Sequence, residues 1–132
     1  IKIDEILYSP LSRAADTAKH IGKVTGIPMR EEIRLNEQNF GKYESTPRHG
    51  EEFEEAKKSF INHFDGGESM FEMAQRIYNL LDDLKKESGE KTYLLVAHNG
   101  ISRVVNSYFH DMTNEEYAAF GIKNCEILKY EF

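Results

Sequence analysis

TYLLVAHNG, residues 92–100, is an apolar run that stops abruptly at a histidine, and the pattern resumes as ISRVV at 101–105. Continuous Tyr, Leu and Val between turn residues are typical of a strand that is covered on both faces. Asn99 and Gly100 tolerate the backbone that a sharp turn requires. The stretch therefore predicts a central buried strand, a tight turn and a helix, with His98 at the carboxyl end of the strand.

The position of His98 has two interpretations. Ligands of open α/β sheets bind at the carboxyl ends of strands, where the first N–H groups of the next helix carry partial positive charge. An imidazole beside such amides suits an anion. The alternative is a histidine that only caps the helix or forms a local hydrogen bond. The stretch alone leaves both interpretations open.

The composition favours one small domain in a reducing compartment. The 132 residues suffice for a single core, and a net charge of −6 without a cluster of Lys and Arg argues against nucleic-acid or anionic-membrane binding. The single cysteine, Cys125, excludes an intramolecular disulfide and a cysteine-rich metal site. Because no apolar run is long enough to span a membrane and the amino terminus has no signal-peptide layout, we expect a cytoplasmic protein.

The rest of the chain alternates strand and helix patterns, which predicts a single α/β layer structure. Ser12 is expected to cap the first helix. The polar, turn-rich residues 36–47 are expected to form a functional loop. The predicted strands are residues 3–8, 27–35 and 124–132, beside the central one, and the predicted helices are 13–25, 51–64, 70–88, 101–109 and 113–120.

Polar groups that suit a phosphoryl group follow two of the predicted strands. Arg13 falls in the first turn of a helix, where a cation opposes the helix dipole unless an anion lies between them. If the strands run parallel, Arg13 and His98 lie at one sheet edge. A guanidinium fork, a histidine donor and turn amides then form a phosphate cradle, and Glu37 on its loop can protonate a leaving alkoxide.

Four motifs resemble those of the histidine phosphatase superfamily, the phosphoglycerate mutase-like proteins. Residues 8–18, YSPLSRAADTA, look like its Ser-Pro-Leu-x-Arg-Ala-x-x-Thr-Ala signature, and residues 37–44 look like its Glu-x-x-Phe-Gly-x-Trp-Glu loop. The triplet at 67–69 with Arg76 is similar to the Gly-Glu-Ser helix start, and residues 96–100 to the second histidine motif. The order and spacing of these motifs agree over nearly the whole chain.

The resemblance implies a three-layer α/β/α sandwich with a mostly parallel central sheet, formed by residues 1–132 as one domain. It also implies hydrolysis of phosphate monoesters through a phosphohistidine, without metal or cofactor, on a small phosphorylated metabolite. A phosphatase is favoured over a mutase that transfers the group intramolecularly, because the loop after Glu37 and residues 45–64 are short. Sugar phosphates, phosphoglycerates and nucleotide-related phosphates such as α-ribazole phosphate are the substrate candidates.

By resemblance, Arg13 is one of two arginines of the phosphate pocket, His98 is its second histidine, and the Asn99 turn completes the phosphate-binding cradle. Glu37 is the general acid, which also prepares water for the second step. Tyr43 and Ser45 stand where the family often has Trp and Gly, and these departures bear on substrate fit.

The main departure lies at the front of the chain. Family members open with a strand that ends in Arg-His-Gly and carries the nucleophilic histidine, whereas this sequence begins after that point. Arg48-His49-Gly50 is a poor substitute, because no apolar strand leads into it. The absence of an inner strand would leave buried backbone groups unpaired, at about 1–3 kcal/mol each. We expect the segment to exist outside these residues, and strand exchange in a homodimer is the alternative.

Two other functions compete with the phosphatase. One is a catalytically inactive phosphate-binding or interaction module, which would use Arg13 and His98 without turnover. The other is an α/β hydrolase with Ser9 or Ser12 as nucleophile, which is disfavoured because neither serine lies in a Gly-x-Ser-x-Gly turn. The remaining histidines lack metal-ligand spacing, so surface or local hydrogen-bonding roles are expected for His20, His63 and His110.

Overall fold

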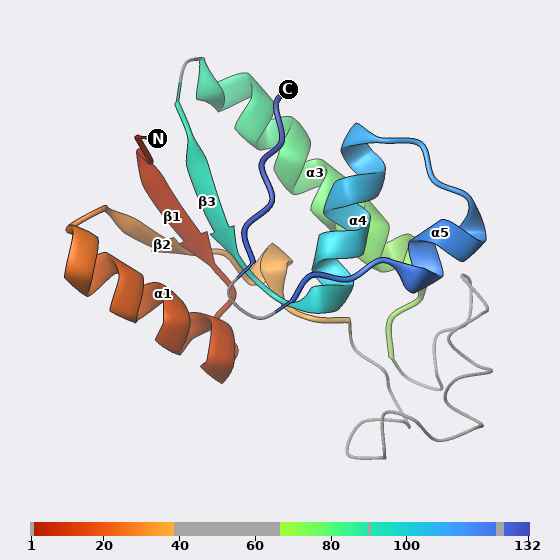
Figure 1. The fold of residues 1–132 in the computed structure, drawn as a ribbon, viewed down its shortest axis with the longest axis horizontal. Helices are drawn as coiled ribbons and strands as arrows, with labels where there is room; N and C mark the ends of the chain where they lie inside the picture. Colours follow the sequence, from red (N-terminus) through yellow and green to blue (C-terminus); the bar gives the residue numbers. More distant parts are fainter. Residues whose placement is uncertain (1, 39–66, 90, 124–125) are drawn as a thin grey trace.

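The computed structural model describes residues 2–38, 67–89, 91–123 and 126–132. Its elements alternate along the chain (Figure 1). They are β1 (Glu5–Tyr8), α1 (Ser12–Thr25), β2 (Met29–Glu31), the 3₁₀ helix η1 (Ile33–Leu35), α3 (Met70–Ser88), β3 (Tyr93–Val96), α4 (Asn99–Phe109) and α5 (Asn114–Ala119).

The strands form a parallel sheet in the order β2-β1-β3. In the register of β1 with its neighbours, Ile6 lies opposite both Met29 and Leu94, and Tyr8 lies opposite Val96. Because the three strands run in one direction, their carboxyl ends share one edge of the sheet. The chain leaves that edge into α1 after β1 and into α4 after β3.

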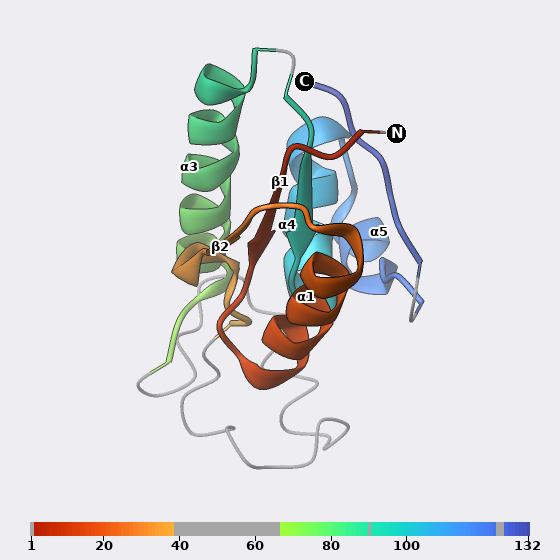
Figure 2. The ribbon, with the colours of Figure 1, turned by 90° about the vertical axis from the view of Figure 1, so that its left-hand side faces the viewer.

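Helices cover both faces of the sheet. Leu7 of β1 belongs to the main core with the buried stripe of α3 and with Ile101 and Val104 of α4. Ile6, its neighbour in β1, is equally buried and points to the opposite face, where Ala14, Ala15 and Ala18 of α1 are buried. Figure 2 shows α1 and α3 on opposite sides of the strands. The expected three-layer α/β/α arrangement with a parallel sheet is confirmed.

The helix predictions within the described residues agree with the structure. The apolar stripe of α3 is buried at Met73, Ile77, Leu80, Leu81 and Leu84. The helix α1 closes at Gly26, whose φ of +74° explains the choice of glycine. Thr113 caps α5 through the predicted capping box with Glu116, and Ser69 caps α3 through a second one with Glu72.

Two predictions about local structure are wrong. Ser12 does not cap α1; the N-cap residue is Leu11, and the buried Ser9 hydroxyl accepts a hydrogen bond from the Leu11 N–H at 3.3 Å. Residues 27–35 are not one extended segment, because β2 ends at Glu31 and the chain then turns through η1. The Glu32 carboxylate fixes this turn by accepting the Arg34 N–H.

The strand that carries His98 is not central within the described part of the chain. There β1 is the inner strand, and β3 is only half-buried because no described residue pairs with its outer edge. An apolar run indicates that side chains are buried, but it does not determine which strands pair. Within the described sheet, β3 therefore lies at the edge beside β1 instead of at the centre, and its direction is parallel as expected.

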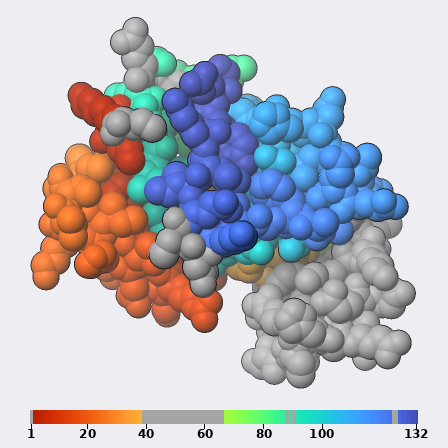
Figure 3. Space-filling model, in the orientation of Figure 1, coloured from red at the N-terminus to blue at the C-terminus, as the bar shows by residue number. Residues whose placement is uncertain are grey.

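The predicted final strand is also wrong over residues 126–132, which form no strand in the structure. This segment runs beside α4 (Figure 3), where Tyr130 stacks on Phe109 with ring centroids 4.9 Å apart. The Tyr130 hydroxyl donates to Asn106 Oδ1 at 2.9 Å. Contacts of Tyr130 and Phe132 with Phe109 take the place of strand pairing here, while Ile127 stays exposed.

The predicted helix at 51–64 and most of the loop 36–47 lie outside the described residues, as do His49, His63 and Cys125. Asn36, Glu37 and Gln38 lie inside them. Among the helices that the structure describes, none combines the length and the apolar character that crossing a membrane requires.

The two serines at helix starts make a matched test of the capping analysis. Ser69→Ala removes the side-chain acceptor for the Glu72 N–H and should lower the free energy of unfolding by about 1 kcal/mol. Ser12→Ala should change it by less than about 0.5 kcal/mol, because that exposed hydroxyl caps nothing. Urea unfolding of both variants measures the difference, and equal losses would contradict the assignment.

Candidate active site

The register of β1 and β3 places Ser9 and His98 next to each other at the carboxyl edge of the sheet. The Ser9 N–H donates to the Val96 carbonyl at 3.0 Å, which extends the ladder by one residue. His98 is the N-cap residue of α4, yet its side chain forms no capping hydrogen bond. Instead, Nε2 of its ring lies 2.9 Å from Ser9 Oγ. The ring is therefore held by the neighbouring strand end, and His98 does not serve as a helix-capping side chain.

The Ser9 hydroxyl also reaches the loop that follows η1. It donates a hydrogen bond to Asn36 Oδ1 at 2.9 Å, across 27 residues of sequence. Ser9 is fully buried. One hydroxyl thus connects three segments: the end of β1, the His98 turn and the start of the Asn36 loop.

Glu37 reaches the first turn of α4. Its Oε2 atom accepts the Gly100 N–H at 3.4 Å, and its Oε1 atom accepts the Gln38 N–H at 3.0 Å. A Cβ atom at Gly100 would lie 2.5 Å from Glu37 Oε1, so a side chain at this position would have to displace the Glu37 carboxylate. The structure therefore brings Glu37 and His98 to the same helix start, although they are 61 residues apart.

The loop that carries Glu37 is fastened to the start of α3. The buried Gln38 side chain donates from Nε2 to the Glu68 carbonyl at 2.9 Å. Arg76 forms a bidentate pair with the Glu68 carboxylate, with N–O distances of 2.8 and 2.9 Å, and it also donates to the Arg34 carbonyl. The residues on both sides of Glu37 are thus tied to α3 or to the segment that leads into it.

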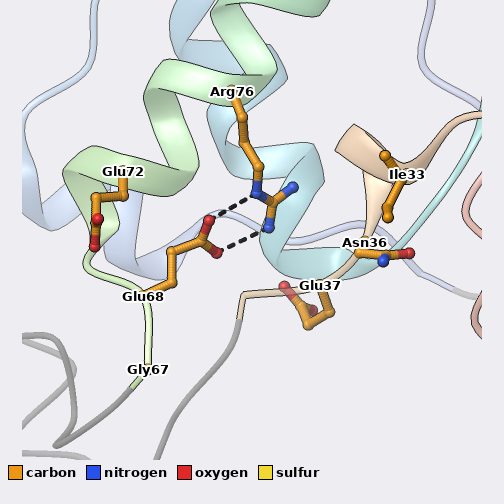
Figure 4. A pocket seen from close by; sticks show the side chains of 7 residues that line it. All are labelled: Ile33, Asn36, Glu37, Gly67, Glu68, Glu72 and Arg76. Carbon is orange, nitrogen blue, oxygen red and sulfur yellow. Dashed lines mark hydrogen bonds and ion pairs between the residues drawn. The ribbon is translucent and has the colours of Figure 1, made fainter.

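Figure 4 shows Asn36 and Glu37 on one side of a pocket of about 410 Å³ and the paired Glu68 and Arg76 on the other. Beside this pocket, Arg34 joins η1 to α3 through Asp83, at 2.8 Å. Burial raises the pKa of Glu32, but hydrogen bonds and charge from Arg34 outweigh burial, so the pKa lies below its ordinary value. The turn before Asn36 therefore has a fixed ion pair.

Arg13 lies in the first turn of α1, as expected, and it is exposed to solvent. It forms no hydrogen bond or ion pair with any of the described residues, and the first turn of α1 contains no acidic side chain. Asn99 is the first residue of α4, and its side-chain oxygen accepts the Ile122 N–H at 2.9 Å. Its side chain is therefore used by the C-terminal segment, while its backbone N–H belongs to the helix start.

Sequence reasoning missed the roles of Ser9, Asn36 and Gln38. The signal for Ser9 was available, because a small polar residue that directly follows a buried strand lies at the ligand edge of the sheet. Asn36 and Gln38 flank Glu37, yet nothing in the sequence indicates their partners 27 and 30 residues away. In the ranges that the structure describes, no group of three or more His, Cys, Asp and Glu side chains is arranged to hold a metal.

Comparison with curated proteins finds similarity along almost the whole chain. A Yersinia pestis (strain Pestoides F) protein named "Probable phosphoglycerate mutase GpmB" is 30% identical over 138 residues, which cover 98% of this chain and 64% of that protein. The chain thus spans 64% of the length of the curated relatives that it matches, which is less than two thirds.

Solved structures show the same fold. The native structure of a mycobacterial glucosyl-3-phosphoglycerate phosphatase gives a TM-score of 0.72 at 25% identity, over 92% of this chain and 66% of that one. The α-ribazole phosphatase of Shigella flexneri gives a TM-score of 0.71 at 22% identity, over 93% and 64% of the two chains.

The family model described as "Histidine phosphatase superfamily (branch 1)" matches residues 1–132. This match covers all four motifs, from the Ser-Pro-Leu segment at the end of β1 to the His98 turn after β3. The chain belongs to the histidine phosphatase superfamily.

Proposed function

We propose that this chain carries the phosphate-binding and proton-transfer residues of an enzyme that hydrolyses phosphate monoesters through a phosphohistidine. The observation that carries the proposal is the convergence of His98 and Glu37 on the first turn of α4, at the carboxyl edge of a parallel sheet. A basic ring and a carboxyl group at one helix start suit a reaction that binds an anion and moves a proton.

In this proposal the phosphoryl group lies between the starts of α1 and α4. Arg13 supplies a bidentate guanidinium fork, His98 a ring donor, and Asn99 its backbone N–H at the helix start. The absence of any described partner for Arg13 supports this role, because a guanidinium that is already paired must first be released. The first N–H groups of α4 add partial positive charge.

Glu37 is the proposed general acid. Its protonated carboxyl gives the proton to the leaving alkoxide as a histidine nucleophile takes the phosphoryl group. In the second step the carboxylate takes a proton from water, and the resulting hydroxide oxygen attacks phosphorus and releases the histidine. The adjoining pocket of about 410 Å³ offers space for the alcohol part of a small metabolite.

Hydrolysis is favoured over transfer within the substrate, although relatives carry both kinds of name. The short loop after Glu37 supports hydrolysis. The substrate is proposed to be a small phosphorylated metabolite, a class that includes the substrates in the names of the mycobacterial and Shigella phosphatases. A substrate screen would distinguish among sugar phosphates, phosphoglycerates and nucleotide-related phosphates.

A second candidate is a phosphate-binding module without turnover. One observation favours it. A phosphohistidine mechanism needs a nucleophilic histidine in addition to His98, and among the described residues neither other histidine lies at the sheet edge: His20 is on the exposed side of α1, and His110 follows α4. Assays with an aryl phosphate separate the two candidates. Vanadate-sensitive turnover with an acid-labile phosphohistidine supports the enzyme, and phosphate binding without either supports the module.

Arg13→Ala tests the phosphate cradle. Loss of charged hydrogen bonds worth about 1.5–3 kcal/mol should weaken binding of inorganic phosphate or vanadate roughly 10- to 100-fold. Titration calorimetry measures the affinity. Lys19→Ala is the matched control, since Lys19 is an exposed cation on the same helix and should leave affinity unchanged. An unaltered affinity in Arg13→Ala would remove Arg13 from the site.

Glu37→Gln tests the acid role. With alkyl phosphates, whose leaving groups need a proton, turnover should fall by about 10²- to 10⁴-fold, and with activated aryl phosphates by less than roughly tenfold. Glu31→Gln, at an exposed carboxylate that ends β2, is the control and should preserve both rates. Equal losses on the two substrate types would deny Glu37 this role.

A further inference from the structure

Ser9 is used by none of the chemistry above, yet it contacts the segments that carry both proposed catalytic groups. Its hydroxyl oxygen lies 2.9 Å from His98 Nε2 and 2.9 Å from Asn36 Oδ1, the residue before Glu37. The serine is fully buried, so water does not replace either contact. Its backbone is fixed as well, because the Ser9 N–H bonds the Val96 carbonyl of β3.

Proton counting at this hydroxyl assigns a role to each partner. A hydroxyl has one proton and two lone pairs. The Ser9 proton is donated to Asn36 Oδ1, and one lone pair accepts the Leu11 N–H at 3.3 Å. The contact with His98 must then use the second lone pair, so Nε2 of the ring is the donor and carries a proton.

We propose that Ser9 is a positioning residue for His98. Its hydroxyl accepts the Nε2 proton, holds the imidazole plane at the sheet edge and ties that position to the Asn36 loop. The inference rests on the proposed function, because it assumes that His98 binds phosphate. It goes further by making the orientation of His98 depend on a side chain from a different strand.

The arrangement also couples the two halves of the site. Asn36 lies next to Glu37, which accepts the N–H of Gly100, two residues after His98. A displacement of the Asn36 loop therefore removes the acceptor of the Ser9 proton. The hydroxyl can then donate its proton toward His98, and this hydrogen bond forms only when Nε2 carries no proton.

The test compares Ser9→Ala, Ser9→Thr and Ser12→Ala in the full chain with ¹⁵N-labelled histidine. One readout is the exchange-protected imidazole N–H resonance of His98, and the other is the affinity for inorganic phosphate. Ser9→Ala should lose the resonance and bind phosphate about tenfold more weakly, equivalent to about 1.4 kcal/mol. Ser9→Thr retains the hydroxyl and should preserve both readouts. Ser12→Ala, at the first residue of α1, should give the same resonance and phosphate affinity as the unaltered chain.

Persistence of the His98 resonance in Ser9→Ala, or undiminished phosphate affinity there, overturns the inference and leaves the proposed function in place. Absence of phosphate binding by the unaltered chain overturns the proposed function and this inference together. If Ser9→Ala does not fold, Asn36→Ala makes the test from the other side. It frees the Ser9 proton and should abolish the protected resonance, and a retained resonance with unchanged phosphate affinity overturns the proposal.

Discussion

The parallel pairing of β1 with β3 is the constraint on which the site depends. With Tyr8 opposite Val96, the residues that leave the two strands emerge side by side, and Ser9 meets His98. The same register places Leu7 beside Leu95 on the face that packs against α3 and α4. Slipping β3 by one residue would turn its side chains to the opposite face. The apolar core and the polar edge are thus fixed by one register.

The site also depends on α3, which packs on one face of the sheet and holds the Glu37 loop in place. Arg76 joins the Glu68 carboxylate to the Arg34 carbonyl, so the start of α3 and the end of η1 cannot separate without breaking a charged network. Gln38 adds a buried contact on the other side of Glu37. A loop glutamate thereby acquires the fixed position that the proposed proton transfer requires, because both of its flanks are bound.

Patterns of local origin were predictable from the sequence, and long-range choices were not. The stripe of α3, the capping box at Thr113 and the place of His98 after a strand follow from spacing within a few residues. The order of strands does not, so β3 was expected at the centre and lies beside β1 at the edge of the described sheet. The contacts of Ser9 with Asn36 and His98 were not predicted, because these partners lie 27 and 89 residues away.

The proposed anion site, in a chain of net charge −6, requires local electrostatic fields to outweigh distant ones. At physiological ionic strength charges are screened beyond about 8 Å, so the acidic surface counts less than groups at the edge itself. Both α1 and α4 begin at this edge, with Arg13 in the first turn of α1 and His98 at the N-cap of α4. Glu37 is the acidic side chain at the same helix start, where it accepts the Gly100 N–H, and in the proposed reaction it transfers a proton instead of binding the anion.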